Sequence, residues 1–161
     1  MIIQPLRQQM IPELIALMQW GAPYITPRTH SDYWLYAHLF SSTCPVATLD
    51  GRLVGATTAF RSQDDPHEMY IQDVMVHPDH RRRGITKALL AHVRQCAADL
   101  GCRRLYLTSE PDNPAAHHTW SALGFRNLPG DNTIGDISII TDFKGPGRSR
   151  AVYELTLERD L

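Results

Sequence analysis

The sequence is poor in cysteine and carries no long apolar run, and each absence excludes a class of protein. It has 3 cysteines, Cys44, Cys96 and Cys102, without a CxxC pair, so neither a disulfide framework nor a thiolate zinc site is expected. The first residues, MIIQPLRQQM, lack a positive segment followed by an apolar one, and no window approaches the roughly 20 apolar residues of a membrane span. We therefore expect a cytoplasmic protein with reduced thiols and no membrane contact.

A surplus of either charge is absent as well. The 16 Lys and Arg residues nearly balance the 17 Asp and Glu residues, for a formal net charge of −1. A general nucleic-acid binder would carry a basic surplus, so no nucleic-acid partner is expected, and any basic site is small and focused. The 8 histidines lack the i, i+4 pairing of a helical zinc site, and no metal is expected.

What the sequence does contain is regular apolar periodicity. With 161 residues, 43% of them hydrophobic, the chain fits one compact domain over residues 1–161. Helical spacing predicts helices at residues 10–18, 31–39, 85–100 and 113–123, the second capped by Ser31. Strands are predicted at residues 2–6, 46–49, 53–60, 69–76, 103–108 and 151–157. Asp50-Gly51 is a strong hairpin signal, so residues 46–76 are expected to form an antiparallel meander of three strands.

One segment has no clear pattern. Residues 126–150 are rich in Gly, Pro, Asp and Asn, and the segment is longer than the usual connection of about 4 to 6 residues. Gly145-Pro146-Gly147 indicates a mobile or partner-contacting loop. The segment could cover a substrate or join the two subunits of a homodimer.

The most informative stretch is the basic turn at residues 81–86, which follows one predicted strand and leads directly into a helix. Unpaired backbone N–H groups and the positive end of the helix dipole converge at such a turn, and glycine at position 84 permits a tight bend. The turn is therefore a candidate anion site, and the ligand that it suggests is a pyrophosphate.

Two motifs in register carry a resemblance to a known family. The first is Gln or Arg, two variable residues, Gly, one variable residue, then Gly or Ala; the second is Asn followed by Ala, Tyr and Gly-Phe at fixed offsets. This chain matches the first at Arg81 and Gly84, with Thr86 in the last position, and the second at Asn113, Ala116, Trp120, Gly124 and Phe125. With the order of its elements, the chain resembles the GNAT superfamily of acyl-CoA N-acyltransferases. The resemblance implies an α/β fold with a mixed, mostly antiparallel sheet of about six or seven strands, about four flanking helices and a splay at the coenzyme site.

The resemblance also implies a coenzyme site and a polarising group. Acetyl-CoA would bind as a co-substrate to the strand end, the basic turn and the following helix start, which are Val74, Met75, Val76, Arg81, Arg82, Arg83, Gly84, Ile85, Thr86 and Asn113. The backbone amide of Val74 would polarise the thioester carbonyl.

The residues expected to transfer protons depart from the family pattern. Many relatives read Ile-Glu-Asp where this chain has Ile71-Gln72-Asp73, and glutamine is no base, so the role passes to Asp73, to Glu68 or to water held by Gln72. Strict strand alternation puts Glu68 and Gln72 on one face and Asp73 on the other, which favours Glu68 if that face meets the acceptor.

The family's acid is often a tyrosine, and this chain has a tryptophan at that position. An indole N–H cannot donate a proton to a thiolate, and His117, His118 and Tyr153 are the other candidates near Trp120.

The predicted function is direct acetyl transfer from acetyl-CoA to a primary amine. Acidic residues near the expected acceptor side, Asp64, Asp65, Glu68 and Asp73, favour a small cationic acceptor such as a polyamine, an amino acid derivative or an aminoglycoside. The alternatives are acetylation of a protein N-terminus or lysine, and a non-catalytic CoA-binding sensor module.

Overall fold

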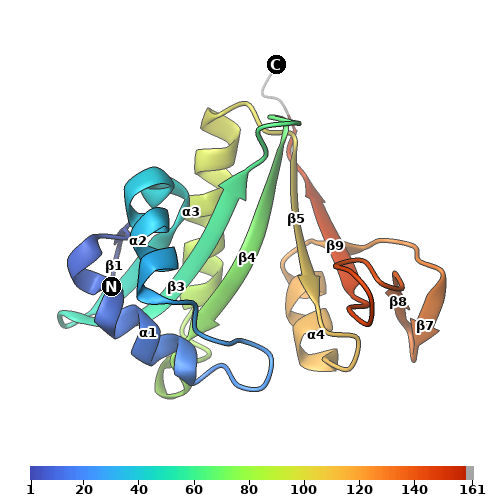
Figure 1. The fold of residues 1–161 in the computed structure, drawn as a ribbon, viewed down its shortest axis with the longest axis horizontal. Helices are drawn as coiled ribbons and strands as arrows, with labels where there is room; N and C mark the ends of the chain where they lie inside the picture. The colour runs from blue at the N-terminus through green and yellow to red at the C-terminus, as the bar shows by residue number, and fades with distance from the viewer. Residues whose placement is uncertain (159–161) are drawn as a thin grey trace.

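The computed structural model describes residues 1–158; the last three residues of the predicted domain, 159–161, lie outside the described part. A seven-stranded sheet runs through the molecule in the order β1-β2-β3-β4-β5-β9-β6 (Figure 1). Its strands are β1 (Ile2–Pro5), β2 (Pro45–Leu49), β3 (Arg52–Arg61), β4 (Glu68–Val76), β5 (Arg104–Ser109), β6 (Arg126–Asn127) and β9 (Ala151–Thr156). Neighbouring strands are antiparallel except β4 and β5, which are parallel. The predicted mixed sheet and the β2-β3-β4 meander are confirmed.

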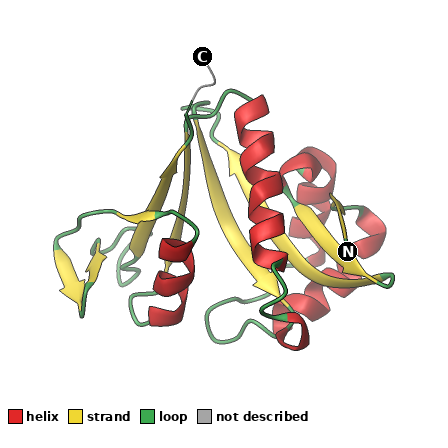
Figure 2. Cartoon of the chain, turned by 180° about the vertical axis from the view of Figure 1, so that it is seen from behind, coloured by secondary structure: helices red, strands yellow, loops and turns green. Residues whose placement is uncertain are grey.

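Helices cover both faces of this sheet. The first pair, α1 (Ile11–Gln19) and α2 (His30–Leu39), lies in front of it in Figure 1; the second pair, α3 (Ile85–Asp99) and α4 (Pro114–Ala122), lies on the opposite face, nearer the viewer in Figure 2. Three short 3-10 turns, η1 (Gln8–Met10), η2 (Ser41–Thr43) and η3 (Pro78–His80), complete the helical elements of residues 1–158. All four predicted helices are present, within two residues at most ends.

The start of α2 differs from the prediction that Ser31 caps it. Thr29 is the cap: its Oγ1 accepts a hydrogen bond from the Asp32 backbone N–H at 3.1 Å, while Asp32 Oδ2 accepts one from the Thr29 N–H at 3.2 Å. This reciprocal pair needs an acidic residue three positions after the cap, and Thr29 has that partner whereas Ser31 does not.

The core lies on both sides of the sheet. Leu14, Met18 and Tyr33 pack from α1 and α2 with Met75 of β4, and a second cluster joins Leu90 and other residues of α3 to β4, β5 and β9. Helix α3 lies especially close to β3, because a Cβ on Gly55 would come within 2.8 Å of Ile85 Cγ2. That close approach fixes the N-terminal turn of α3 against the sheet.

The segment 126–150 contains more structure than its composition predicts. Besides β6 it holds a hairpin of β7 (Asn132–Ile134) and β8 (Ile137–Ile139). The side chain of Asn127 ties the hairpin to the sheet, since its Nδ2 donates to the Ser138 carbonyl at 3.1 Å and its Oδ1 accepts from the Ser138 N–H at 2.8 Å. Strands of two or three residues are too short to show a period in the sequence, which is why they were not predicted.

Candidate active site

Strands β4 and β5 separate halfway along their length and leave a cleft between them. They pair only from Glu68 with Arg104 to Ile71 with Leu107, so residues 72–76 of β4 have a neighbouring strand on the β3 side alone. Figure 1 shows the two strands diverging toward the lower edge of the sheet. The cleft has a volume of about 890 Å³ and is walled by β4, the start of α3, the end of β5 and α4. A strand with one open edge can pair with an extended ligand.

A β-bulge at Gln72 decides which side chains face the cleft. Asp73 is paired with Thr58 and Ile71 with Ala59, so one residue of β4 has no counterpart in β3. Ile71 accordingly packs with α3, whereas Met75, an even number of residues later, packs with α1 and α2. The bulge therefore reverses the alternation, and the prediction that Asp73 lies on the face opposite Glu68 is wrong.

Asp73 lies on the α1 and α2 face of the sheet and lines the cleft. Its Oδ2 is buried and has no hydrogen-bond partner within residues 1–158. Burial raises the pKa of this carboxyl group, while the charges of Arg28 and Lys144 act in the opposite direction. On the strand opposite, Thr58 Oγ1 is also buried without a partner.

Glu68 lies away from the cleft. Its Oε2 accepts from Arg104 Nη1 at 2.9 Å, and Arg104 Nε donates to Glu154 Oε1 at 2.6 Å, so Glu68 belongs to an ion-pair network where β4 and β5 still pair. The structure thus separates Glu68 from Gln72, Asp73 and Val74, which all line the cleft.

The basic turn borders one end of the cleft. Helix α3 begins after Gly84, whose φ of 76° lies in the left-handed region, and no side chain caps its first turn. The helix start therefore presents unpaired backbone N–H groups next to the positive end of the helix dipole, which together attract an anion. The turn residues that line the cleft are Arg81, Arg82, Gly84, Ile85 and Thr86. Arg83 does not line the cleft, although its Nη1 lies 3.5 Å from Nδ1 of His80, which does.

Helix α4 forms the opposite wall. Asn113 lines the cleft and caps the helix, because its Oδ1 accepts from the Ala116 N–H at 3.1 Å. Trp120 Nε1 donates to Ser109 Oγ at 3.0 Å, and this hydrogen bond connects α4 to the end of β5. The indole N–H is too weak an acid to protonate a thiolate.

Of the other candidate acids, only His118 lines the cleft. Tyr153 is buried, its hydroxyl lies 2.7 Å from His117 Nδ1, and burial raises its pKa to about 12. Tyr153 is therefore part of the core and not a proton donor for the cleft.

Residues from two loops line the cleft that sequence reasoning did not single out. They are Arg28, which precedes α2, and Lys144 and Arg150 from the connection between β8 and β9. Nothing in the local pattern marks them, because only the tertiary fold brings these loops to β4. Conversely, Asp64 and Asp65 lie outside the cleft, so the local acidity that favoured a cationic acceptor is not an acidic cleft.

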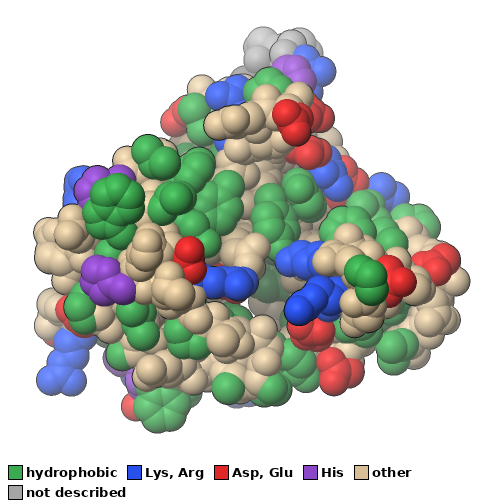
Figure 3. All heavy atoms as spheres, in the orientation of Figure 1, with side chains coloured by type: hydrophobic (Ala, Val, Ile, Leu, Met, Phe, Trp, Pro, Cys, Tyr) green, Lys and Arg blue, Asp and Glu red, His purple; other side chains and the backbone are tan. Residues whose placement is uncertain are grey.

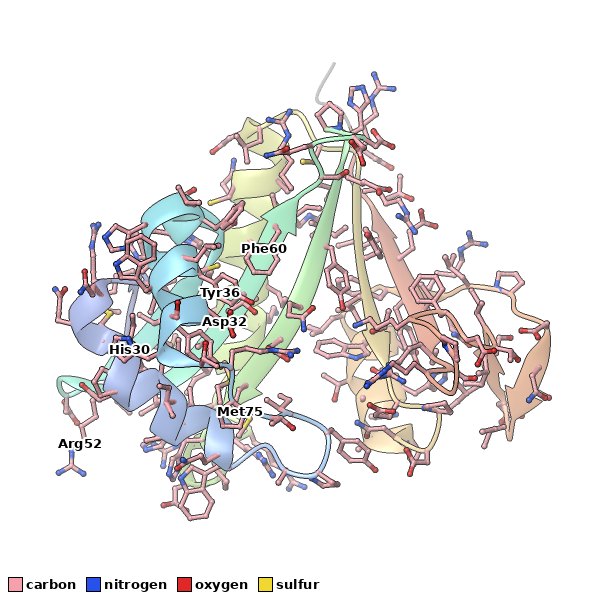
Figure 4. All side chains as sticks on the ribbon, viewed as in Figure 1. His30, Asp32, Tyr36, Arg52, Phe60 and Met75 are labelled. Atoms are coloured by element: carbon pink, nitrogen blue, oxygen red, sulfur yellow. The ribbon has the colours of Figure 1, made fainter. Side chains whose placement is uncertain are left out.

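Most aromatic side chains on the α2 face of the sheet pack with the core. Tyr36 of α2 and Phe60 of β3 lie close together on the α2 face in Figure 4, with ring centroids 4.8 Å apart. Tyr33 is fully buried, whereas Tyr24 lines the cleft and donates its hydroxyl to the Asp112 carbonyl at 3.2 Å.

Two further searches of residues 1–158 bear on the class of protein. No group of three or more His, Cys, Asp or Glu side chains is placed to hold a metal ion. No helix in the described chain has the length and apolar character needed to cross a membrane.

Comparison with protein families supports the resemblance. The model described as the acetyltransferase (GNAT) family matches residues 14–125. Among curated proteins, L-2,4-diaminobutyric acid acetyltransferase of Nocardia farcinica is 33% identical over 94 residues, which are 58% of this chain and 49% of the relative. Aminoglycoside N(6')-acetyltransferase type 1 of Salmonella typhimurium is 29% identical over 86 residues, 50% of this chain and 59% of the relative. The matches thus span about half the length of these relatives.

Solved structures share the whole fold. Diaminobutyrate acetyltransferase from Paenibacillus lautus, in complex with L-2,4-diaminobutyric acid and coenzyme A, superposes with a TM-score of 0.75 at 21% identity, covering 99% of this chain and 97% of that one. At this identity the likeness establishes the arrangement of strands and helices.

Proposed function

The chain belongs to the acetyltransferase (GNAT) family, and we propose that it transfers an acetyl group from acetyl-CoA to the primary amine of a small molecule. The observation that carries this proposal is the cleft between β4 and β5, which is lined both by the basic turn at the start of α3 and by the buried carboxyl group of Asp73. The relatives that act on diaminobutyric acid and on aminoglycosides support a small amine as acceptor.

The cleft residues suit coenzyme A. The backbone N–H groups of Gly84, Ile85 and Thr86 at the start of α3 would hold the pyrophosphate, with charge from Arg81 and Arg82. The open edge of β4 at Val74, Met75 and Val76 would pair with the pantetheine arm, and Asn113 would border it from α4. Arg83, which does not line the cleft, is left out of this set.

Asp73 is the proposed base and the Val74 amide the proposed polarising group. Bound acetyl-CoA supplies a thioester whose carbonyl carbon accepts the amine nitrogen; the C–N bond forms, the C–S bond breaks and coenzyme A leaves as a thiolate. Asp73 would take the proton that the amine loses, directly or through water held by Gln72. The Val74 N–H, directly after the bulge, would stabilise negative charge on the carbonyl oxygen.

At the position of the family's tyrosine on α4, this chain has Trp120. Because a thiol has a pKa of about 8.5, coenzyme A can leave as a thiolate and take its proton from water. Acetyl transfer therefore does not require an acid at the position of Trp120. The same tryptophan favours a second candidate, a CoA-binding sensor that performs no transfer.

Two further properties are proposed with the function. The free thiols of Cys44, Cys96 and Cys102 support a reducing, cytoplasmic setting. Ile134 and Phe143, both exposed on the 126–150 segment, support a homodimer joined through that segment.

The function is tested by titrating the protein with acetyl-CoA in a calorimeter and then following thiol release over a panel of small amines. Binding followed by amine-dependent thiol release is the expected result. Binding with no release for any amine would instead support the sensor, and absence of binding would remove both candidates.

A further inference from the structure

Basic side chains gather at the acceptor end of the cleft, away from the turn proposed for pyrophosphate. Arg28, Lys144 and Arg150 line the cleft together with the acidic residues Asp73 and Glu110. Figure 3 shows Lys and Arg side chains on both sides of the hollow in the middle of the front face. The charge of this end is therefore positive in sum, although the whole chain has a formal net charge of −1.

Lys144 is held too far along β4 to serve the pyrophosphate. Its ammonium donates to the hydroxyl of Tyr70 and lies 5.0 Å from the centroid of that ring. Tyr70 precedes the bulge, and the basic turn begins beyond Val76. Six residues of strand separate the two by roughly 20 Å, far more than the length of a lysine side chain.

Arg28 is placed at the same end by its own loop. Its backbone N–H donates to the buried hydroxyl of Tyr33 at 3.0 Å, which anchors the loop before α2. The guanidinium lies near enough to Asp73 to act against the raised pKa of that carboxyl.

Arg28 and Lys144 differ from Arg150 because neither has an ion-pair partner among the described residues. Arg150 Nη1 lies 3.2 Å from Glu110 Oε2, so these two charges compensate each other. Within residues 1–158, no carboxylate oxygen lies within 4.0 Å of a charged nitrogen of Arg28 or Lys144. Two cations thus face one buried carboxylate, Asp73, without forming a contact pair with it.

A polycationic acceptor does not suit this arrangement. A polyamine or an aminoglycoside would bring its remaining ammonium groups toward Arg28 and Lys144, and like charges in one cleft disfavour binding. A carboxylate on the acceptor would neutralise this surplus of positive charge and give Arg28 and Lys144 the ion-pair partner that they lack.

We propose that the acceptor is a small amino acid, an amine that also carries a carboxylate, with the carboxylate held between Arg28 and Lys144 and the reacting amine beside Asp73. This assignment narrows the substrate class of the proposed function and rests on it. Of the acceptors expected from the sequence, it favours the amino acid derivative over the polyamine and the aminoglycoside.

The test compares acceptors that differ by the carboxylate alone. L-2,4-diaminobutyrate with 1,3-diaminopropane, L-ornithine with putrescine, and L-lysine with cadaverine are three such pairs, and thiol release from acetyl-CoA gives kcat and KM for each member. We expect at least one pair in which kcat/KM favours the amino acid by about ten-fold or more, the equivalent of one charge-assisted hydrogen bond. Diamines that react as well as their amino acids in every pair would overturn the proposal.

Substitutions of Arg28 and Lys144 test whether these side chains cause the preference for the amino acid over its diamine. Lys144→Gln and Arg28→Gln should each raise KM for the amino acid by about ten-fold. Neither should raise the KM of the matched diamine, because each removes a charge that repels its second ammonium group. Lys144→Arg should recover much of the loss, because it restores the charge. Arg52→Gln is the control: Arg52 is exposed at the β2-β3 hairpin, far from the cleft in Figure 4, and its loss removes the same charge. A preference that survives both Gln variants, or that falls equally in the control, would contradict the assignment.

A binding measurement distinguishes failure of the carboxylate site from failure of the proposed transferase activity. If no probe is acetylated, the same pairs are titrated calorimetrically into protein saturated with coenzyme A. Tighter binding of the amino acid that is lost in Lys144→Gln would support the carboxylate site while removing the transferase activity. Equal binding of both members, or binding of neither, would overturn the carboxylate site.

Discussion

Asp73 combines a cost to stability with a use in catalysis. Its carboxyl group is buried beside the bulge of β4, its Oδ2 has no partner in the described chain, and burial raises its pKa. A carboxylate without hydrogen bonds is a better proton acceptor than one in a salt bridge, which is the state of Glu68. The two carboxylates that the sequence offered as bases, Asp73 and Glu68, therefore differ in their surroundings, which favour Asp73.

Replacing each carboxylate in turn tests which of them is the base. Asp73→Asn should lower kcat by about a hundred-fold or more, because a positioned base contributes at least that factor. It should also remove the decline of kcat/KM that the wild type shows as pH falls through the raised pKa of Asp73. Glu68→Gln should keep both the rate and that acidic limb. Steady-state kinetics against pH give the answer, and a larger loss in Glu68→Gln would return the base to Glu68.

Asp73→Asn should also stabilise the protein. Because the folded chain binds the Asp73 proton more tightly than the unfolded chain does, this group lowers the free energy of unfolding as pH rises through its raised pKa. Asparagine has no charge to bury. We expect Asp73→Asn to gain about 1 kcal/mol at neutral pH, or about 2 to 4 °C in Tm. The gain should shrink at acid pH, where the wild-type carboxyl is protonated; a Tm lowered at neutral pH would contradict a costly buried charge.

At the scale of elements, the bulge in β4 and the start of α3 build the site. The bulge turns Asp73 toward α1 and α2 while Val74 packs on the α3 side, so base and backbone amide follow one another along the strand. Gly55 lets α3 approach β3, which holds the N-terminal turn of the helix at the edge of the cleft.

Two glycines with matching backbones test the role of that turn. Gly84 and Gly51 have φ values of +76° and +77°, and a Cβ would meet nothing within 4 Å at either. Gly84→Asp should weaken acetyl-CoA binding by about ten-fold or more, because it sets a carboxylate against the pyrophosphate. Gly51→Asp carries the same strain and charge in the β2-β3 hairpin and should leave the affinity unchanged. Equal losses of affinity in calorimetry would mean that strain, and not the anion site, is responsible.

The elements also show where the sequence is informative. Long amphipathic helices such as α3 and the Asp50-Gly51 hairpin are set by local patterns, and both were predicted. The bulge at Gln72 was not, because one unpaired residue leaves no mark in the pattern of the strand. Arg28 and Lys144 were missed for a different reason: they lie in loops, and only the folded chain brings them to β4.

At the scale of the whole molecule, the cleft divides the sheet into two parts. Strands β1 to β4 with α1, α2 and α3 stand on one side, and β5, β9 and β6 with α4 stand on the other, joined where β4 and β5 still pair (Figure 1). A ligand that pairs with the open edge of β4 and also contacts α4 would connect the two parts and bind only the folded chain.

Saturating coenzyme A should therefore raise Tm. At a concentration about a hundred times its Kd the ligand adds about 2.7 kcal/mol, equivalent to about 5 to 10 °C for a domain of this size. Differential scanning fluorimetry measures the shift, and Gly84→Asp should reduce it. A shift of the same size in that variant would place the coenzyme elsewhere.

The most direct test of acetyl transfer by this cleft is mass spectrometry of the acceptor after incubation with acetyl-CoA and the purified protein. We predict that a small amine gains one acetyl group in an amide bond, at a rate that falls by about a hundred-fold in Asp73→Asn while that variant still binds acetyl-CoA. Acetylated product formed as fast by Asp73→Asn as by the wild type, or no product from any amine despite bound acetyl-CoA, would contradict it.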